Sequence, residues 1–192
     1  QALGRAFQIN SGFDAKSALK FQEMVQAYGN VDKLVPQEAR INELLKEDAA
    51  YLPAWILKAM LLEHRAQFKA AAAEYERILK SYPTFSPAVV KAALVYSEKL
   101  GDDKSALTHA LKAREVTRDD PRIARVLGKS YAAQADWPSA VRNLRQAVQS
   151  GLEDAELYLL LGKAEASTKE FPRSKASLEK ALSLKPASNV EK

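Results

Sequence analysis

The sequence contains no cysteine among its 192 residues and only two histidines, His64 and His109. The lack of cysteine excludes disulfides, zinc–thiolate sites and cysteine nucleophiles, although it leaves the cellular compartment open. Neither histidine has an acidic residue or a second histidine three or four positions further on, which a metal site or a helical general base would need. We therefore predict no metal, no cofactor and no catalytic residue.

Long apolar runs and glycine-rich phosphate loops are also missing. No stretch approaches the ~20 consecutive apolar residues of a membrane-spanning helix, and no charged-then-apolar signal segment follows Gln1. The acidic pairs Asp102-Asp103, Asp119-Asp120 and Glu153-Asp154 stand at predicted turns before helices, where a short carboxylate caps exposed N–H groups. We interpret these pairs as helix caps rather than as catalytic carboxylates, and we predict that the chain is not an enzyme.

A repeat of about 34 residues is what the sequence does contain. Leu127-Gly128 returns thirty-four positions later as Leu161-Gly162. Periods in this range indicate stacked helix pairs. Counting in both directions predicts five units near residues 18–51, 52–85, 86–120, 121–154 and 155–188, with one extra residue before Gly101 and an upstream half-repeat or cap in 1–17.

Each predicted unit carries the same helical stripe. A large residue at the fourth position is followed by a small one at the eighth and often an aromatic at the eleventh, as in Val89, Ala93 and Tyr96. Residues at this spacing lie on one face of a helix. The small residue, which is Gly128 in the fourth unit and Gly162 in the fifth, would let a second helix approach closely. The second helices are predicted to start just after Leu34, Phe68, Trp137 and Phe171.

This pattern resembles the tetratricopeptide repeat family over nearly the whole chain. The best matches lie in the second and fourth units, at Trp55, Ala59, Leu62, Phe68, Ala71, Tyr75, Pro83, Leu127, Gly128, Tyr131, Ala140, Leu144 and Ala147. The first unit departs from the pattern at Gln37, the third at Ala110, and the fifth at Glu165 and Ser174. The resemblance implies an all-α fold, a right-handed superhelical solenoid of about five helix-turn-helix repeats.

The ends of the chain and the lack of linkers bear on its organisation. No flexible linker divides the units, so we predict one array over residues 1–192. Because the sequence begins at Gln1 without an initiator methionine, we favour a piece of a longer protein over a processed one. After Pro186 no segment remains to cover the last helix, which leaves Leu178, Leu182 and Leu184 for further repeats, a second copy of the chain or a partner.

The resemblance also implies where a partner would bind, because the first helices of successive units line the inner surface of such arrays. Carrying the family's inward positions over to this sequence gives a predicted groove of Ile56, Met60, Val90, Lys91, Leu94, Arg122, Arg125, Lys129 and Lys163. This groove would be apolar in its early units and basic in its late ones.

Basic residues are concentrated in the later part of the predicted groove. Residues 104–145 hold nine Lys or Arg against four Asp or Glu, an excess of five that equals the net charge of the whole chain, +5. A localised basic patch speeds encounters with acidic partners and weakens as salt rises. The alternative is that these residues belong to an ordinary solvent-exposed surface with no binding role, because several of them lie on second helices that face outward.

We therefore predict a noncatalytic adaptor or assembly scaffold that binds a peptide or partner segment with apolar anchors and acidic residues. The alternative is a structural spacer, or a self-association module acting through the uncapped last helix, within a larger assembly that could be envelope-associated. A minor alternative is RNA binding by stacking on aromatic residues, which packing between repeats explains better. Those aromatic residues are Tyr28, Trp55, Tyr75, Tyr96, Tyr131 and Trp137.

Overall fold

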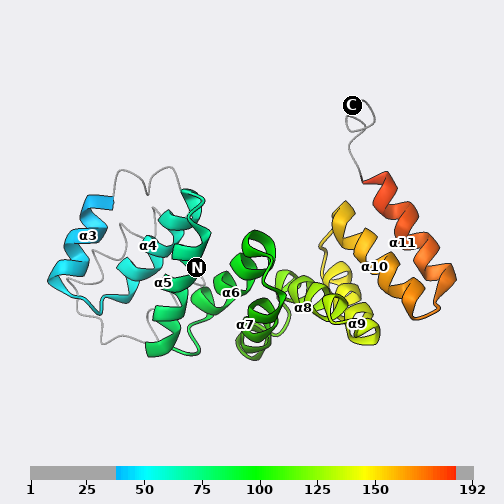
Figure 1. Cartoon of the computed structure of the whole chain (residues 1–192), viewed down its shortest axis with the longest axis horizontal. Coiled ribbons are helices and arrows are strands. Elements are labelled where there is room, and N and C mark those ends of the chain that lie inside the picture. Colours follow the sequence, from blue (N-terminus) through cyan, green and yellow to red (C-terminus); the bar gives the residue numbers. More distant parts are fainter. Residues whose placement is uncertain (1–37, 185–192) are drawn as a thin grey trace. The chain divides into compact units, whose positions relative to one another are not determined.

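The structure is a computed structural model that describes residues 38–184. Every regular element in that part of the chain is a helix and none is a strand, which confirms the all-α class (Figure 1). The chain divides into two compact units, Gln1–Val95 and Tyr96–Lys192. The predicted half-repeat in 1–17, the first helix of the 18–51 unit and the segment around Pro186 lie outside the described residues.

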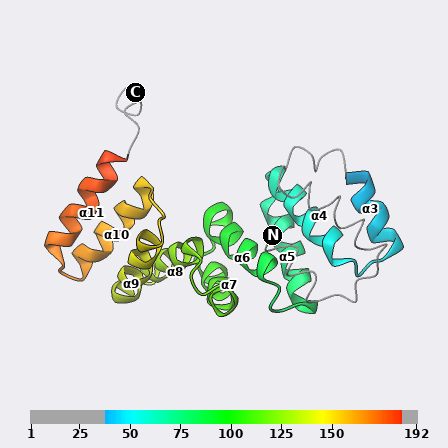
Figure 2. The ribbon, with the colours of Figure 1, turned by 180° about the vertical axis from the view of Figure 1, so that it is seen from behind.

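The first compact unit contains α3 (Glu38–Glu47), α4 (Leu52–His64), α5 (Phe68–Ser81) and α6 (Ser86–Leu94). Each of these helices packs on the next one along the chain (Figures 1 and 2). Tyr75 of α5 is fully buried and donates a hydrogen bond through its hydroxyl to the Glu63 carboxylate. The core of this unit therefore lies between successive helices.

The second compact unit follows the same plan. It begins within a π-helical segment, η3 (Val95–Leu100), whose residues from Tyr96 onward belong to it. The helices that follow are α7 (Asp103–Val116), α8 (Pro121–Ala133), α9 (Trp137–Gln149), α10 (Ala155–Ser167) and α11 (Phe171–Ser183). From α7 onward each helix packs on its successor. A cluster that includes Leu144, Leu157 and Leu161 forms the core between α8, α9 and α10.

The first helix of each helix pair starts where the repeat period places it. The helices α4, α6, α8 and α10 begin at Leu52, Ser86, Pro121 and Ala155, the residues at which the predicted units begin. Proline lies in the first turn of α4, α6 and α8, where its missing N–H costs nothing. Proline in the first turn therefore helps to determine where α4, α6 and α8 begin.

Aspartates cap four helices of the second compact unit. The carboxylates of Asp102, Asp120, Asp136 and Asp154 accept hydrogen bonds from backbone N–H groups in the first turns of α7, α8, α9 and α10. Hydrogen bonds from the side chain and backbone of Ser105 lower the pKa of Asp102. The expectation that the acidic pairs at turns cap helices is confirmed at Asp102, Asp120 and Asp154.

The turn between the two helices of a pair contains one residue in the left-handed region. Ala66, Ala135 and Lys169 have φ values of 56°, 60° and 63°, and Gly101 has φ 65°. In three turns the hydrogen bond that closes the first helix spans five residues, as between the Asp136 N–H and the Tyr131 carbonyl (3.0 Å). Such closures are Schellman motifs.

The turn after η3 differs from the other three by one residue. Here the Asp102 N–H bonds to the Tyr96 carbonyl, six residues back, at 2.9 Å. A π-helix holds one more residue per hydrogen-bonded ring than an α-helix, so it absorbs a single insertion. The extra residue expected before Gly101 therefore lies in η3.

Two glycines bring paired helices into close contact, as the repeat pattern predicts. A Cβ at position 128 would come within 2.5 Å of the Leu144 Cγ, and one at position 162 within 2.7 Å of the Leu178 Cγ. A leucine of the second helix therefore occupies the space that a side chain at position 128 or 162 would need.

Candidate binding site

The apolar part of the predicted groove is largely interior. Ile56, Met60 and Val90 are only 1%, 7% and 6% exposed. Their helices carry apolar residues on nearly every side, and a helix of that kind is covered all round. These three side chains hold the first compact unit together and present little surface to a partner.

Lys91 and Leu94 remain near the surface of that unit. Both are half-buried, and the Lys91 Nζ lies 3.2 Å from a carboxylate oxygen of Glu63. The same carboxylate accepts the Tyr75 hydroxyl. The charge of Lys91 is therefore balanced within the unit.

One face of α8 connects the first helices of the second compact unit. The Arg125 guanidinium lies 2.9 Å from Asp154 and 3.0 Å from Glu156, which begin α10. On the other side, the Lys129 Nζ donates to the Ser97 carbonyl of η3 at 3.1 Å. Arg125 and Lys129 are one turn apart, so a single stripe of α8 contacts both neighbours.

On α10 the matching stripe runs through Glu156, Leu160 and Lys163, at spacings of four and three residues. Leu160 is half-buried and Lys163 is exposed. Lys163 has no acidic partner among the described residues, in contrast to Arg125. A surface formed by η3, α8 and α10, called here the first-helix surface, therefore carries one uncompensated cation beside an apolar side chain.

Arg122, at the start of α8, points toward its own capping residue. Its guanidinium lies 2.6 Å from the Asp120 carboxylate. Burial favours the neutral acid of Asp120, but the side-chain and backbone hydrogen bonds from Arg122 outweigh it and hold the pKa of Asp120 below its usual value. Arg122 is thus the most exposed of the paired cations on α8, with 54% of its side chain accessible.

Most of the basic stretch between 104 and 145 is engaged inside the chain. Six of its nine cations have a partner: Arg114 bonds to Asn143, Arg142 to Ser139 and Arg145 to two glutamates, besides Arg122, Arg125 and Lys129. The other three are Lys104, Lys112 and Arg118, on α7 and the loop after it. The excess of positive charge in this stretch therefore lies both on a first helix, α8, and on the second helices α7 and α9.

Glu165 and Ser174, the two departures from the repeat pattern in the fifth unit, belong to a polar network between α10 and α11. The Glu165 carboxylate is 3% exposed, lies 2.7 Å from Arg145 of α9 and accepts the Ser177 hydroxyl at 2.7 Å. The Ser174 hydroxyl donates to the Gly162 carbonyl at 2.8 Å. The sequence marked Glu165 and Ser174 as unusual without indicating their partners.

An open hollow of about 400 Å³ lies beside this network, between α9 and the turn from α10 to α11. Hydrogen bonds from Arg145 lower the pKa of Glu170 at its rim. Because Glu165 and Glu170 already balance Arg145, the hollow is poorly suited to an anion. Its lining residues are Pro138, Val141, Arg142, Arg145, Gln149, Thr168 and Glu170.

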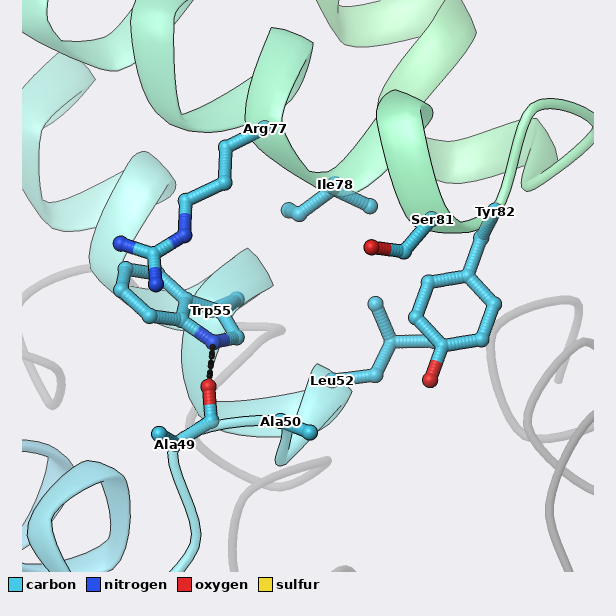
Figure 3. Close-up of a pocket in the computed structure, with 8 residues that line it drawn as sticks. All are labelled: Ala49, Ala50, Leu52, Trp55, Arg77, Ile78, Ser81 and Tyr82. Atoms are coloured by element: carbon cyan, nitrogen blue, oxygen red, sulfur yellow. Dashed lines mark hydrogen bonds between the residues drawn. The ribbon is translucent and has the colours of Figure 1, made fainter.

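A smaller cavity of about 150 Å³ lies where the start of α4 meets the end of α5. Trp55 and Arg77 form one wall and Tyr82 the opposite wall, with Ile78 and Leu52 between them (Figure 3). The Arg77 Cζ lies 3.6 Å from the centre of the Trp55 ring. The remaining lining residues are Ala49, Ala50 and Ser81. Sequence reasoning assigned Trp55 to the repeat pattern and gave no sign of this cavity.

No group of three or more His, Asp or Glu side chains in residues 38–184 could hold a metal ion. None of the helices described there has the length and apolar character to span a bilayer.

Comparisons with known proteins identify the repeat. Residues 155–188 match the sequence model named "Tetratricopeptide repeat", and no curated protein sequence matches the chain. Among solved structures, MamA from Desulfovibrio magneticus RS-1 is 15% identical, with a TM-score of 0.72 over 91% of this chain and 97% of that one. YrrB, described as "a TPR protein with an unusual peptide-binding site", is 17% identical, with a TM-score of 0.71 over 97% and 94%. The chain therefore has the tetratricopeptide-repeat fold.

Proposed function

We propose that this set of tetratricopeptide-type repeats is a noncatalytic binding module that holds a peptide or partner segment on its first-helix surface. In the second compact unit Lys163 is the proposed charged contact, and Arg122, Arg125 and Lys129, whose side chains already have partners, would shape the surface beside it. Lys91 and Leu94, on α6 of the first compact unit, are proposed contacts of that unit's own surface. Ile56, Met60 and Val90 would support these surfaces from the interior.

The observation that carries the proposal is the stripe of α8. Arg125 and Lys129 reach the neighbouring elements on both sides, which supports a continuous surface from η3 to α10. Their side chains are held in place by these contacts, so little conformational entropy would be lost when a partner docks. The uncompensated Lys163, next to Leu160, would give the surface a preference for an acidic segment with an apolar anchor.

YrrB is described as having a peptide-binding site. At 17% identity that likeness supports the same fold here, and the residues of the first-helix surface support binding. Apolar contacts to the half-buried Leu160 and Leu94 would add affinity at roughly 25 cal/mol per Å² buried before association costs. The cations would set orientation and encounter rate.

Selection of short random peptides displayed on phage tests the proposal. We expect the selected peptides to combine acidic and apolar residues, and we expect Lys163→Glu to weaken their binding at least tenfold. Lys175→Glu provides the matched control, because Lys175 lies on α11 with 78% of its side chain exposed. If the selected peptides bind both variants as tightly as they bind the unaltered chain, the first-helix surface is not the binding site.

We also propose, as a second candidate, that α11 supports self-association. Phe171 and Leu182 of α11 are 64% and 67% exposed. The residues thirty-four positions earlier, Trp137 and Val148, pack against the cluster that contains Leu157 of the following helix. A second copy of the chain could cover the α11 face as α10 covers that of α9.

Sedimentation over a range of protein concentrations tests this second candidate. We expect a concentration-dependent dimer that is lost on Leu182→Glu and on Phe171→Glu, while Lys175→Glu on the same helix leaves it unchanged. Leu178 is unsuitable for this test because it packs on Gly162. A chain that stays monomeric at high concentration would argue for the peptide-binding role alone.

A further inference from the structure

The cavity between α4 and α5 has the features of a ligand site of its own. It lies in the first compact unit and contains none of the residues of the first-helix surface, so it does not depend on the function proposed above. Its volume of about 150 Å³ is close to that of an apolar cavity that accommodates benzene. It can therefore take one ring or one branched aliphatic group, and the rest of any ligand must lie outside.

The walls of the cavity combine apolar surface with hydrogen-bonding groups. Leu52, Ile78 and the Trp55 ring supply the apolar part. The hydroxyls of Ser81 and Tyr82 have no hydrogen-bond partner among the described residues, and both belong to the wall opposite Trp55 (Figure 3). Hydroxyls at the rim of an apolar cavity can bond to the backbone of a chain that crosses it.

Arg77 gives the cavity its charge preference. Its guanidinium stacks on the Trp55 ring, with 3.6 Å between the Cζ and the ring centre. Stacking uses the face of the guanidinium, so its N–H groups remain directed outward in the plane, where they can bind a carboxylate. No described carboxylate pairs with Arg77, whereas the nearby Lys58 is paired with Glu74 at 2.9 Å.

The Trp55 indole is also fixed in position. Its Nε1–H donates to the Ala49 carbonyl at 2.8 Å. The ring therefore has one orientation, held by this hydrogen bond on its edge and by Arg77 on its face. A rigid aromatic wall loses little entropy when a ligand binds.

We propose that this cavity binds one Leu-sized or single-ring side chain of a peptide whose neighbouring residue is acidic and pairs with Arg77. A peptide fits better than a compact metabolite because only one side chain enters and the adjoining backbone then passes Ser81 and Tyr82. The same chemistry occurs in a free branched carboxylic acid, which the experiment below separates from a peptide.

NMR titration of the whole chain with capped tetrapeptides tests the proposal. The probe is acetyl-Ser-Leu-Glu-Ser-amide, and the reporter is the indole N–H signal of Trp55, which Trp137→Phe distinguishes from that of Trp137. We expect the Trp55 signal to shift at millimolar peptide. Replacing Leu by Ala, or Glu by Gln, in the peptide should weaken binding at least tenfold.

Two variants of the chain separate binding from folding. Arg77→Gln should weaken binding at least tenfold, whereas Arg40→Gln, an exposed arginine on α3 of the same compact unit, should leave it unchanged. Arg77→Gln also removes the stack on Trp55, so Ser81→Leu, which fills the cavity from an exposed position, provides a second loss-of-binding variant. The circular dichroism of Ser81→Leu should match that of the unaltered chain.

Three outcomes would overturn the proposal. The first is a Trp55 signal that does not move, and the second is equal binding by Arg77→Gln or by Ser81→Leu. The third is tighter binding of 4-methylpentanoate than of the tetrapeptide, which would make the natural ligand a small carboxylic acid. None of these results bears on Lys163→Glu, so failure here is distinct from failure of the first-helix surface.

Discussion

Gly128 lies so close to Leu144 that a Cβ on residue 128 would come within 2.5 Å of the Leu144 Cγ. Leu144 is fully buried, and its backbone nitrogen would lie 3.2 Å from the same Cβ. Glycine at this position is therefore required by contact between α8 and α9 rather than by backbone conformation.

Gly128→Ala should destabilise the chain. Alanine gains about 1 kcal/mol of helix propensity over glycine, but overpacking a buried contact typically costs about 1–3 kcal/mol. We expect a net loss of roughly 1 kcal/mol, measured by urea unfolding. Gly162→Ala is the matched control, and its loss should be smaller because the opposing Leu178 is only half-buried and can move. A stabilised Gly128→Ala would show that the two helices lie further apart.

Glu165→Gln should weaken the contact between α9, α10 and α11. The substitution keeps the shape of the side chain but removes the charge that Arg145 faces at 2.7 Å. Because Arg145 keeps Glu170, we expect a loss of about 1–3 kcal/mol, in the range of a charge-assisted hydrogen bond. The control is Glu179→Gln, whose pair with Lys175 is exposed and 3.9 Å long, so its effect should stay within about 0.5 kcal/mol. Equal effects would mean that burial of Glu165 contributes nothing.

The repeat period and the small residues made much of the fold predictable. Both are local properties of the sequence. They predicted the starts of α4 at Leu52 and α8 at Pro121, and the close contact at Gly128. The extra residue before Gly101 was also expected. Its accommodation as a π-helix was not, because the choice between a π-turn and a longer loop depends on which hydrogen bonds form.

The candidate sites were less predictable, because exposure and side-chain contacts depend on neighbouring helices. Ile56 and Met60 were expected in a groove and are buried, since α4 is apolar on nearly every side. The stack of Arg77 on Trp55 and the pair of Arg145 with Glu165 join different helices through long side chains. A sequence pattern fixes the positions of such residues but not the rotamers that bring them together.

The cap at Asp102 should make stability depend on acid pH. The folded-state pKa of Asp102 lies below its usual 3.8, because the side chain and backbone of Ser105 donate hydrogen bonds to the carboxylate. A depressed pKa contributes stability above the unfolded-state value, and that contribution is lost as pH falls through the folded-state value. The Asp102 cap therefore loses its contribution to stability below about pH 4.

Asp102→Asn tests this dependence, because asparagine also caps helices but does not titrate. We expect the difference in melting temperature between the unaltered chain and Asp102→Asn to shrink as the pH is lowered from neutral to below 4. Asp119→Asn, an exposed aspartate that caps no helix, should show no such trend. A difference that stays constant with pH would mean that the carboxylate charge does not contribute to the cap.

Deleting Glu98 should convert η3 into α-helix without unfolding the chain. The deletion would restore the 34-residue period and place Gly101 where Ala135 and its counterparts lie, so the closing bond to Asp102 would span five residues instead of six. The Ser97 carbonyl would then accept a helical N–H and release Lys129. We expect the free energy of unfolding to change by less than about 1 kcal/mol.

The matched control deletes Ala133, which is exposed and has the same position counted from the start of its unit. That deletion would leave the Tyr131–Asp136 closure one residue short, which breaks the Schellman motif and shifts α9 against α8. We expect a loss of roughly 2–4 kcal/mol, measured by urea unfolding and circular dichroism. Since both deletions remove one exposed residue from the end of a first helix, the difference between them isolates the π-helical insertion. If both were equally damaging, η3 would be a required part of the fold and not an accommodated extra residue.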